Sequence, residues 1–96
     1  MTSIFLRALR VFGPEHQLRK VAEECAECSA AAIRYLNDSI DPARIDHFAE
    51  ELADVEIMVY QARQIIGDDR VDAWKEKKAK RLHDRLEVIE RKERTK

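Results

Sequence analysis

The chain has 96 residues, of which 39% are charged and 45% hydrophobic, so it suits one small domain. This composition excludes a disordered acidic tail, and two Gly and two Pro residues are too few for the turns of a β-sandwich. No apolar run approaches the ~20 residues of a membrane span, and the N-terminal residues lack a secretory pattern. The cysteines, Cys25 and Cys28, do not suggest a disulfide framework, so we expect a cytoplasmic protein with no membrane partner.

Charge is distributed unevenly along the chain. Residues 75–96 hold ten Lys/Arg and five Asp/Glu, a net charge of +5, whereas residues 1–74 hold eight and fourteen, a net charge of −6. A solvated helix with i,i+4 pairs explains much of the basic part. Its interleaved acids and the absence of an aromatic platform argue against nucleic-acid binding. The pattern favours an acidic body that holds cations and a basic helix that meets an anion.

Four helices are predicted in chain order, which makes residues 1–96 a single all-α domain. The second and third are long and form an antiparallel hairpin, the flanking helices are short, and a frayed tail begins at residue 91. Gly13 and Gly67 end helices, and Asp68 or Asp69 is expected to cap the helix that follows Gly67. Asp41-Pro42 combines an N-cap acceptor with Pro at the first helical position. The predicted helices cover residues 3–12, 14–36, 42–66 and about 68–90.

The third predicted helix carries a heptad stripe of apolar residues, which we call the seam. Its members recur at alternating intervals of three and four, so we expect them to be buried. Off-seam apolar residues such as Ile57, Met58 and Ile65 predict burial on two sides, against the second helix and against a second copy of the chain. The expected assembly is a helical bundle formed as a homodimer or a dimer of dimers. The seam consists of Ile45, Phe48, Leu52, Val55, Val59, Ala62 and Ile66.

Four acidic residues stand in matching pairs on the two long helices. Glu24 and Glu27 are three residues apart and share a helix face, as do Glu51 and Asp54. Each pair directly precedes apolar residues of its helix, so antiparallel packing brings the four carboxylates together beside the core. Clustered carboxylates repel one another unless cations neutralise them, and oxygen ligands select Mg²⁺ or Mn²⁺. The alternative for each residue alone is a solvated acidic face.

These residues resemble the motif of the MazG-like all-α nucleoside triphosphate pyrophosphohydrolases. The motif E-E-x-x-E followed by E-x-x-D stands here as Glu23-Glu24-x-x-Glu27, a gap of 23 residues, and Glu51-x-x-Asp54. Residues 12–17 look like the aromatic-Gly…Gln approach of that family, and residues 78–82 resemble its K-x-x-R-L element. The resemblance implies Mg²⁺ ligation by Glu24, Glu27, Glu51 and Asp54. It also implies hydrolysis of NTPs or dNTPs to a monophosphate and pyrophosphate, a house-cleaning reaction of the nucleotide pool.

The remaining site predictions follow from what such a reaction requires. Glu23 or Glu50, each beside a ligand pair, is expected to orient or deprotonate the attacking water, and the sequence does not choose between them. Lys78 and Arg81 share a face that suits the leaving pyrophosphate, although Lys75 and Lys77 compete for this role and Lys78 also suits a snorkelling position. Gln17 is placed to touch a base or a phosphate.

Two further expectations concern the histidines and the class of function. The histidines, His16, His47 and His83, are scattered along the chain and are expected at the surface. The alternative function is a non-catalytic helical module that oligomerises or binds partners through the seam, with its acids merely solvated. The paired carboxylates favour the enzyme, because an assembly module has no need of them.

Overall fold

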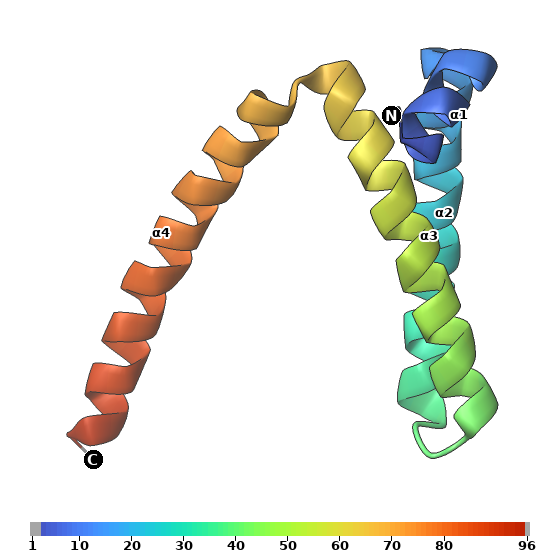
Figure 1. Cartoon of the computed structure of the whole chain (residues 1–96). Coiled ribbons are helices and arrows are strands. Elements are labelled where there is room, and N and C mark those ends of the chain that lie inside the picture. The colour runs from blue at the N-terminus through green and yellow to red at the C-terminus, as the bar shows by residue number, and fades with distance from the viewer. Residues whose placement is uncertain (1–2, 96) are drawn as a thin grey trace. The chain divides into compact units, whose positions relative to one another are not determined.

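Four helices account for most of residues 3–95, the part of the chain that the computed structural model describes (Figure 1). No strand occurs within this part, which confirms the predicted all-α class. The chain divides into two compact units, the first ending at Ile65 and the second beginning at Ile66. The helices are α1 (Ile4–Phe12), α2 (Pro14–Asn37), α3 (Pro42–Ile66) and α4 (Asp68–Arg94).

Side-chain caps and prolines start the first three helices. The Ser3 hydroxyl accepts the Phe5 amide at 3.1 Å, and the Asp41 carboxylate accepts the Ala43 amide at 3.0 Å, which confirms the cap predicted before Pro42. Pro14 opens α2, where the missing N–H of proline costs no hydrogen bond. The predicted helix starts therefore lie within one residue of the observed ones.

Single glycines connect α1 to α2 and α3 to α4. Gly13 has φ 89° and Gly67 has φ 117°, a region of backbone conformation that other residues rarely adopt. Gly67 is itself the N-cap of α4, so the prediction that Asp68 or Asp69 occupies that position is wrong. The two aspartates instead lie in the first helical turn, where negative charge stabilises the helix dipole.

The helix α4 is longer than expected. The prediction of short flanking helices fits α1, with 9 residues, whereas α4 has 27. The described part of the predicted frayed segment 91–96 is helical through Arg94, and Lys96 lies outside the described residues. Strong helix formers fill this helix, and basic residues in its last turn complement the dipole, which explains its persistence.

Contacts between α2 and α3 show how the first unit is built. The Gln17 side chain near the start of α2 bonds to Gln61 near the end of α3, at 2.7 Å. Tyr35 near the end of α2 contacts Phe48 near the start of α3, with ring centroids 5.7 Å apart. The two helices therefore lie side by side and run in opposite directions (Figure 1). An edge contact between Phe5 and Tyr60, 6.0 Å between centroids, attaches α1 to α3.

The face that α3 buries differs from the predicted one. The seam is largely accessible, with Ile45 at 48%, Leu52 at 45% and Ile66 at 55% exposure. The residues that α3 does bury are Glu51, Met58 and Gln61, and α2 correspondingly buries Gln17 and Ala31. Glu51 precedes Leu52, so its side chain leaves the helix about 100° away from that seam residue. The seam therefore meets α2 only in part, as in the contact between Phe48 and Tyr35, and the face beside it supplies the buried side chains of α3.

Candidate functional site

The buried face between α2 and α3 is mostly polar. The Gln17 amide donates to Gln61 at 2.7 Å, and its carbonyl oxygen lies 2.7 Å from the His16 ring nitrogen Nδ1. The Gln61 amide in turn contacts the Met58 sulfur at 3.9 Å. These bonds satisfy polar groups that would otherwise be costly to bury. Gln17 therefore holds the two helices together, and its predicted contact with substrate stays a prediction.

Three of the predicted metal ligands meet on this face. Glu24 of α2 and Glu51 and Asp54 of α3 each offer a carboxylate oxygen, and these oxygens all lie within 4.8 Å of one another. Glu51 is buried, and Glu24 and Asp54 are half-buried. We call these three residues the carboxylate cluster. It joins residues separated by about thirty positions in sequence, so the pairing of α2 with α3 creates it.

The electrostatics of the carboxylate cluster are unfavourable without a cation. Glu24 Oε2 and Glu51 Oε2 are buried and have no hydrogen-bond partner. Burial raises the pKa of Glu24, the charges of Glu27, Asp54 and Glu51 raise it further, and Lys20 lowers it. Lys20 Nζ is 4.0 Å from Glu24 Oε1 and also 3.8 Å from Glu23 Oε2, so one ammonium is divided between two acids.

These properties fit a divalent cation. A hard cation takes carboxylate oxygens as ligands, and its charge relieves the repulsion among the three acids. Buried oxygens without a hydrogen-bond partner are rare in native proteins, and a bound ion is one recognised explanation for them. The donor set contains only oxygen, which suits Mg²⁺ or Mn²⁺ better than Zn²⁺.

The other predicted acids lie at the edge of the carboxylate cluster. Glu27 is exposed, and although its charge acts on Glu24, it does not join the group whose oxygens lie within 4.8 Å. Glu23 and Glu50 are also exposed. Glu50 offers an oxygen within 4.8 Å of both His47 and Glu51, whereas Glu23 is near Lys20. Of the two candidates for positioning water, Glu50 is therefore the one gathered with a member of the carboxylate cluster.

The predicted anion-binding residues belong to α4, in the second unit. Lys78 and Arg81 are exposed there. Of the competing basic residues, Lys77 places its ammonium 4.9 Å from the centroid of the Trp74 ring, a cation–π contact that leaves Trp74 half exposed. The pair of Lys78 and Arg81 on one face of α4 stays a prediction for binding pyrophosphate.

The sequence interpretation missed the position of His47. Its side chain is 42% exposed, as expected of a surface residue, but the sequence did not indicate that its Nε2 lies 3.9 Å from Glu51 Oε1. The available indication was the i,i+4 spacing of His47 and Glu51, which places both on one helix face. That spacing becomes informative only once Glu51 is known to be buried.

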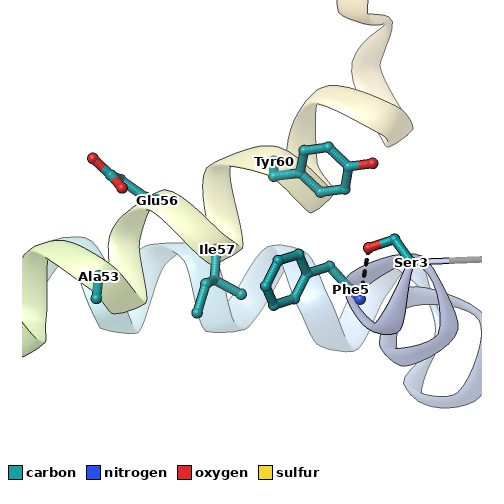
Figure 2. Close-up of a pocket in the computed structure, with 6 residues that line it drawn as sticks. All are labelled: Ser3, Phe5, Ala53, Glu56, Ile57 and Tyr60. Atoms are coloured by element: carbon teal, nitrogen blue, oxygen red, sulfur yellow. Dashed lines mark hydrogen bonds between the residues drawn. The ribbon is translucent and has the colours of Figure 1, made fainter.

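A separate, largely apolar pocket lies between the N-terminal segment and α3. Figure 2 shows Ser3 and Phe5 on one side and four residues of α3 on the other, with the Glu56 carboxylate pointing away from the Phe5 ring. Asp54 of the carboxylate cluster follows Ala53 of this pocket, so their side chains leave the helix about 100° apart. The pocket is therefore distinct from the carboxylate cluster. Its lining consists of Ser3, Phe5, Ala53, Glu56, Ile57 and Tyr60.

Two kinds of observation bear on the assignment, namely the hydropathy of the helices and the comparisons with known proteins. Within residues 3–95, no helix has a stretch that is both long enough and apolar enough to cross a membrane. A scan against protein-family models and searches of curated proteins and of solved structures find no match. The functional assignment therefore depends on the residues and their geometry.

Proposed function

We propose that this protein is a divalent-cation-dependent hydrolase that cleaves nucleoside triphosphates, ribo or deoxy, to a monophosphate and pyrophosphate. The observation that carries the proposal is the carboxylate cluster, in which three acids from two helices meet with two buried, unpartnered oxygens. The reaction class comes from the resemblance of these acids to the E-E-x-x-E and E-x-x-D motif of the pyrophosphohydrolases. A surface face of acids requires no such burial, so the cluster favours an ion site over a solvated face.

Each acid has a distinct proposed role. Glu24, Glu51 and Asp54 hold Mg²⁺, or Mn²⁺ in its place, and Glu27 completes the set from the exposed edge. The cation supplies charge neutralisation of the triphosphate and activation of water. Glu50 is the better candidate to orient that water and accept its proton, because it is gathered with Glu51 while Glu23 is near Lys20.

We further propose that the hairpin of α2 and α3 assembles with a second copy through the seam. Leu52, Phe48 and Val55 line a shallow apolar groove together with the α2 residues Cys25, Cys28, Ser29 and Ala32. Burying such a surface stabilises a two-fold dimer by roughly 25 cal/mol for each Å² of apolar area removed from water. Lys78 and Arg81 are the proposed residues for binding pyrophosphate.

The decisive test is pyrophosphate release by the purified full-length chain. We expect release from one or more of the four NTPs and four dNTPs with Mg²⁺ present, and none after chelation. Exchange of Asp54 for asparagine preserves the side-chain shape but removes an anionic ligand, so D54N should be inactive while circular dichroism stays unchanged. Release that is independent of Mg²⁺, or equal in D54N, would contradict the proposal. A protein inert toward all eight substrates would favour a helical oligomerisation module instead.

A further inference from the structure

We infer that His47, Glu50 and Glu51 form a second cation position, which takes a first-row transition ion such as Mn²⁺, Co²⁺ or Zn²⁺. This position shares Glu51 with the carboxylate cluster, and it also uses Glu50, which has a role in the proposed function. The inference rests on the proposed function through these two residues. We call it the histidine position. It differs from the carboxylate cluster in containing an imidazole nitrogen.

The three side chains converge because of their spacing on one helix. Glu50 and Glu51 follow His47 by three and four residues in α3, so all three lie toward one face. Their candidate ligand atoms lie within 4.8 Å of one another, and His47 Nε2 is 3.9 Å from Glu51 Oε1. Small side-chain rotations bring such atoms to the ~2.0–2.2 Å distances of metal–nitrogen and metal–oxygen bonds.

The burial of Glu51 supports an ion at this position as well as at the carboxylate cluster. Its side chain is 8% exposed and its Oε2 is buried without any partner. A carboxylate has about four lone-pair sites on two oxygens, and His47 approaches only Oε1. One carboxylate can therefore serve two ions, one on each oxygen, as in sites where two metals lie about 3.5–4 Å apart.

The helix α4 contains a matched contrast. His83 Nε2 and Glu87 Oε1 have the same i,i+4 spacing and lie 3.8 Å apart, and Asp84 is 3.5 Å from the other ring nitrogen. Their side chains are between half and three-quarters exposed, so water already satisfies them. These three residues do not form a metal-binding group among the residues that the structure describes. The burial of Glu51, and not the spacing, distinguishes the histidine position.

The donor set determines the class of ion. Imidazole nitrogen suits Zn²⁺, Co²⁺ and other transition ions, whereas Mg²⁺ requires oxygen ligands and near-ideal octahedral geometry. Glu50 is exposed and His47 is partly exposed, which leaves one side of the position accessible to water or to a substrate oxygen. The two positions should therefore differ in selectivity, with Mg²⁺ at the carboxylate cluster and a transition ion beside it.

Pulsed electron paramagnetic resonance of Mn²⁺-loaded, full-length protein tests this inference. Electron spin-echo envelope modulation detects the ¹⁴N nucleus of a coordinated imidazole. We expect nitrogen modulation in the wild type and in the control H83Q, and its loss in H47Q. The double variant H16Q/H83Q retains His47 as the sole histidine and should keep the modulation. That variant keeps the test decisive even if H47Q does not fold. Absence of modulation in the wild type, or loss of it in H16Q/H83Q, would overturn the inference.

A titration with Co²⁺ provides a second measurement. Removing a direct ligand should weaken Co²⁺ binding about tenfold or more in H47Q, because even outer-shell partners are worth that much. The affinity for Mg²⁺ should change far less. Equal Co²⁺ affinity in H47Q and the wild type would contradict the histidine position. Pyrophosphate release without nitrogen modulation would defeat this inference alone, whereas modulation without release would defeat only the proposed function.

Discussion

The helices α3 and α4 are similar in length, with 25 and 27 residues, and each carries a histidine–glutamate pair, but they differ in what surrounds that pair. Both contain a His–Glu pair at i,i+4, with 3.9 Å between His47 and Glu51 and 3.8 Å between His83 and Glu87. In the described residues, α3 buries three side chains, two of them polar, and α4 buries none. The same spacing is thus an ordinary solvated pair on α4 and part of a candidate ion site on α3.

The difference shows that i,i+4 spacing alone does not create a candidate ion site, and that the carboxylate must also be buried. On α4 each carboxylate exchanges contacts with water, so its charge is screened and its pairs contribute little. On α3 the Glu51 carboxylate has lost water on one oxygen without gaining a donor. That loss is unfavourable unless a cation compensates for it.

The largest expected effect separates Glu51 from Glu87. E51Q should reduce Mg²⁺-dependent pyrophosphate release by at least about 100-fold, because it removes a direct anionic ligand. E87Q, its counterpart on α4, should retain wild-type activity. Steady-state assays at saturating Mg²⁺ measure both rates, and circular dichroism checks the fold. Near-wild-type activity in E51Q would remove Glu51 from the site.

The seam provides the next comparison, since both helices expose large apolar residues. We expect light scattering at micromolar concentration to report two or four times the 11.2 kDa chain mass. L52K should shift this mass toward one chain, because a charge on the seam opposes burial against a second copy. V88K, which alters an exposed valine of α4, should leave the mass unchanged. A wild-type mass of one chain, with activity intact, would refute the assembly.

Metal should stabilise the first unit. An ion that binds only the folded state at 100 times its Kd adds about 2.7 kcal/mol to the free energy of unfolding. The melting temperature should therefore rise with millimolar Mg²⁺ and fall again with a chelator. The increase should be absent in E51Q and present in E87Q. A melting temperature that is insensitive to Mg²⁺ and to chelator would count against the carboxylate cluster.

The buried glutamine pair should matter more than an exposed ion pair. Q61A leaves the Gln17 amide buried without its partner, which we expect to lower the free energy of unfolding by about 1–3 kcal/mol. K80A breaks the 3.4 Å ion pair between Lys80 and Asp84, in which the two side chains are 79% and 62% exposed. This variant should change the free energy of unfolding by about 0–0.5 kcal/mol. Urea denaturation measures both values. A similar cost for the two variants would mean that α2 and α3 do not depend on this hydrogen bond.

The smallest effect concerns pH in chelated protein. The pKa of Glu24 is raised in the folded state above its ordinary value of 4.5. The unfolded chain therefore releases this proton first, and stability decreases as pH rises from about 4.5 through the folded-state pKa. E24Q removes this contribution, so its stability relative to wild type should increase over that range and then level off. The reverse trend in pH-dependent melts would contradict the assigned shift.

Much of the secondary structure was predictable from local chemistry. Gly13 and Gly67 interrupt the chain where positive φ is required, and Asp41 with Pro42 begins α3 through a cap that needs no distant contact. These features depend on neighbouring residues alone. The end of α4 was placed too early, because its helix formers and last-turn basic residues stabilise it beyond residue 90.

The candidate site was predictable only in its composition. The matched spacing of Glu24 with Glu27 and of Glu51 with Asp54 identified the acids. It also predicted that both pairs lie equally beside a buried apolar stripe. In the structure Glu24, Glu51 and Asp54 gather, while Glu27 stays exposed. A small rotation of α3 about its axis separates these outcomes, and helical periodicity leaves that rotation undetermined when apolar residues cover more than one stripe.

By itself, the sequence determined the four helices and the acids that two of them carry, because propensities, caps and i,i+3 spacing act within a few residues. Tertiary structure decided which face of α3 meets α2. It thereby decided that Glu51 is buried and the seam is accessible, and that His47 has a buried acid as its neighbour. Burial depends on contacts between residues far apart in the chain, such as Gln17 with Gln61, and no local pattern specifies them.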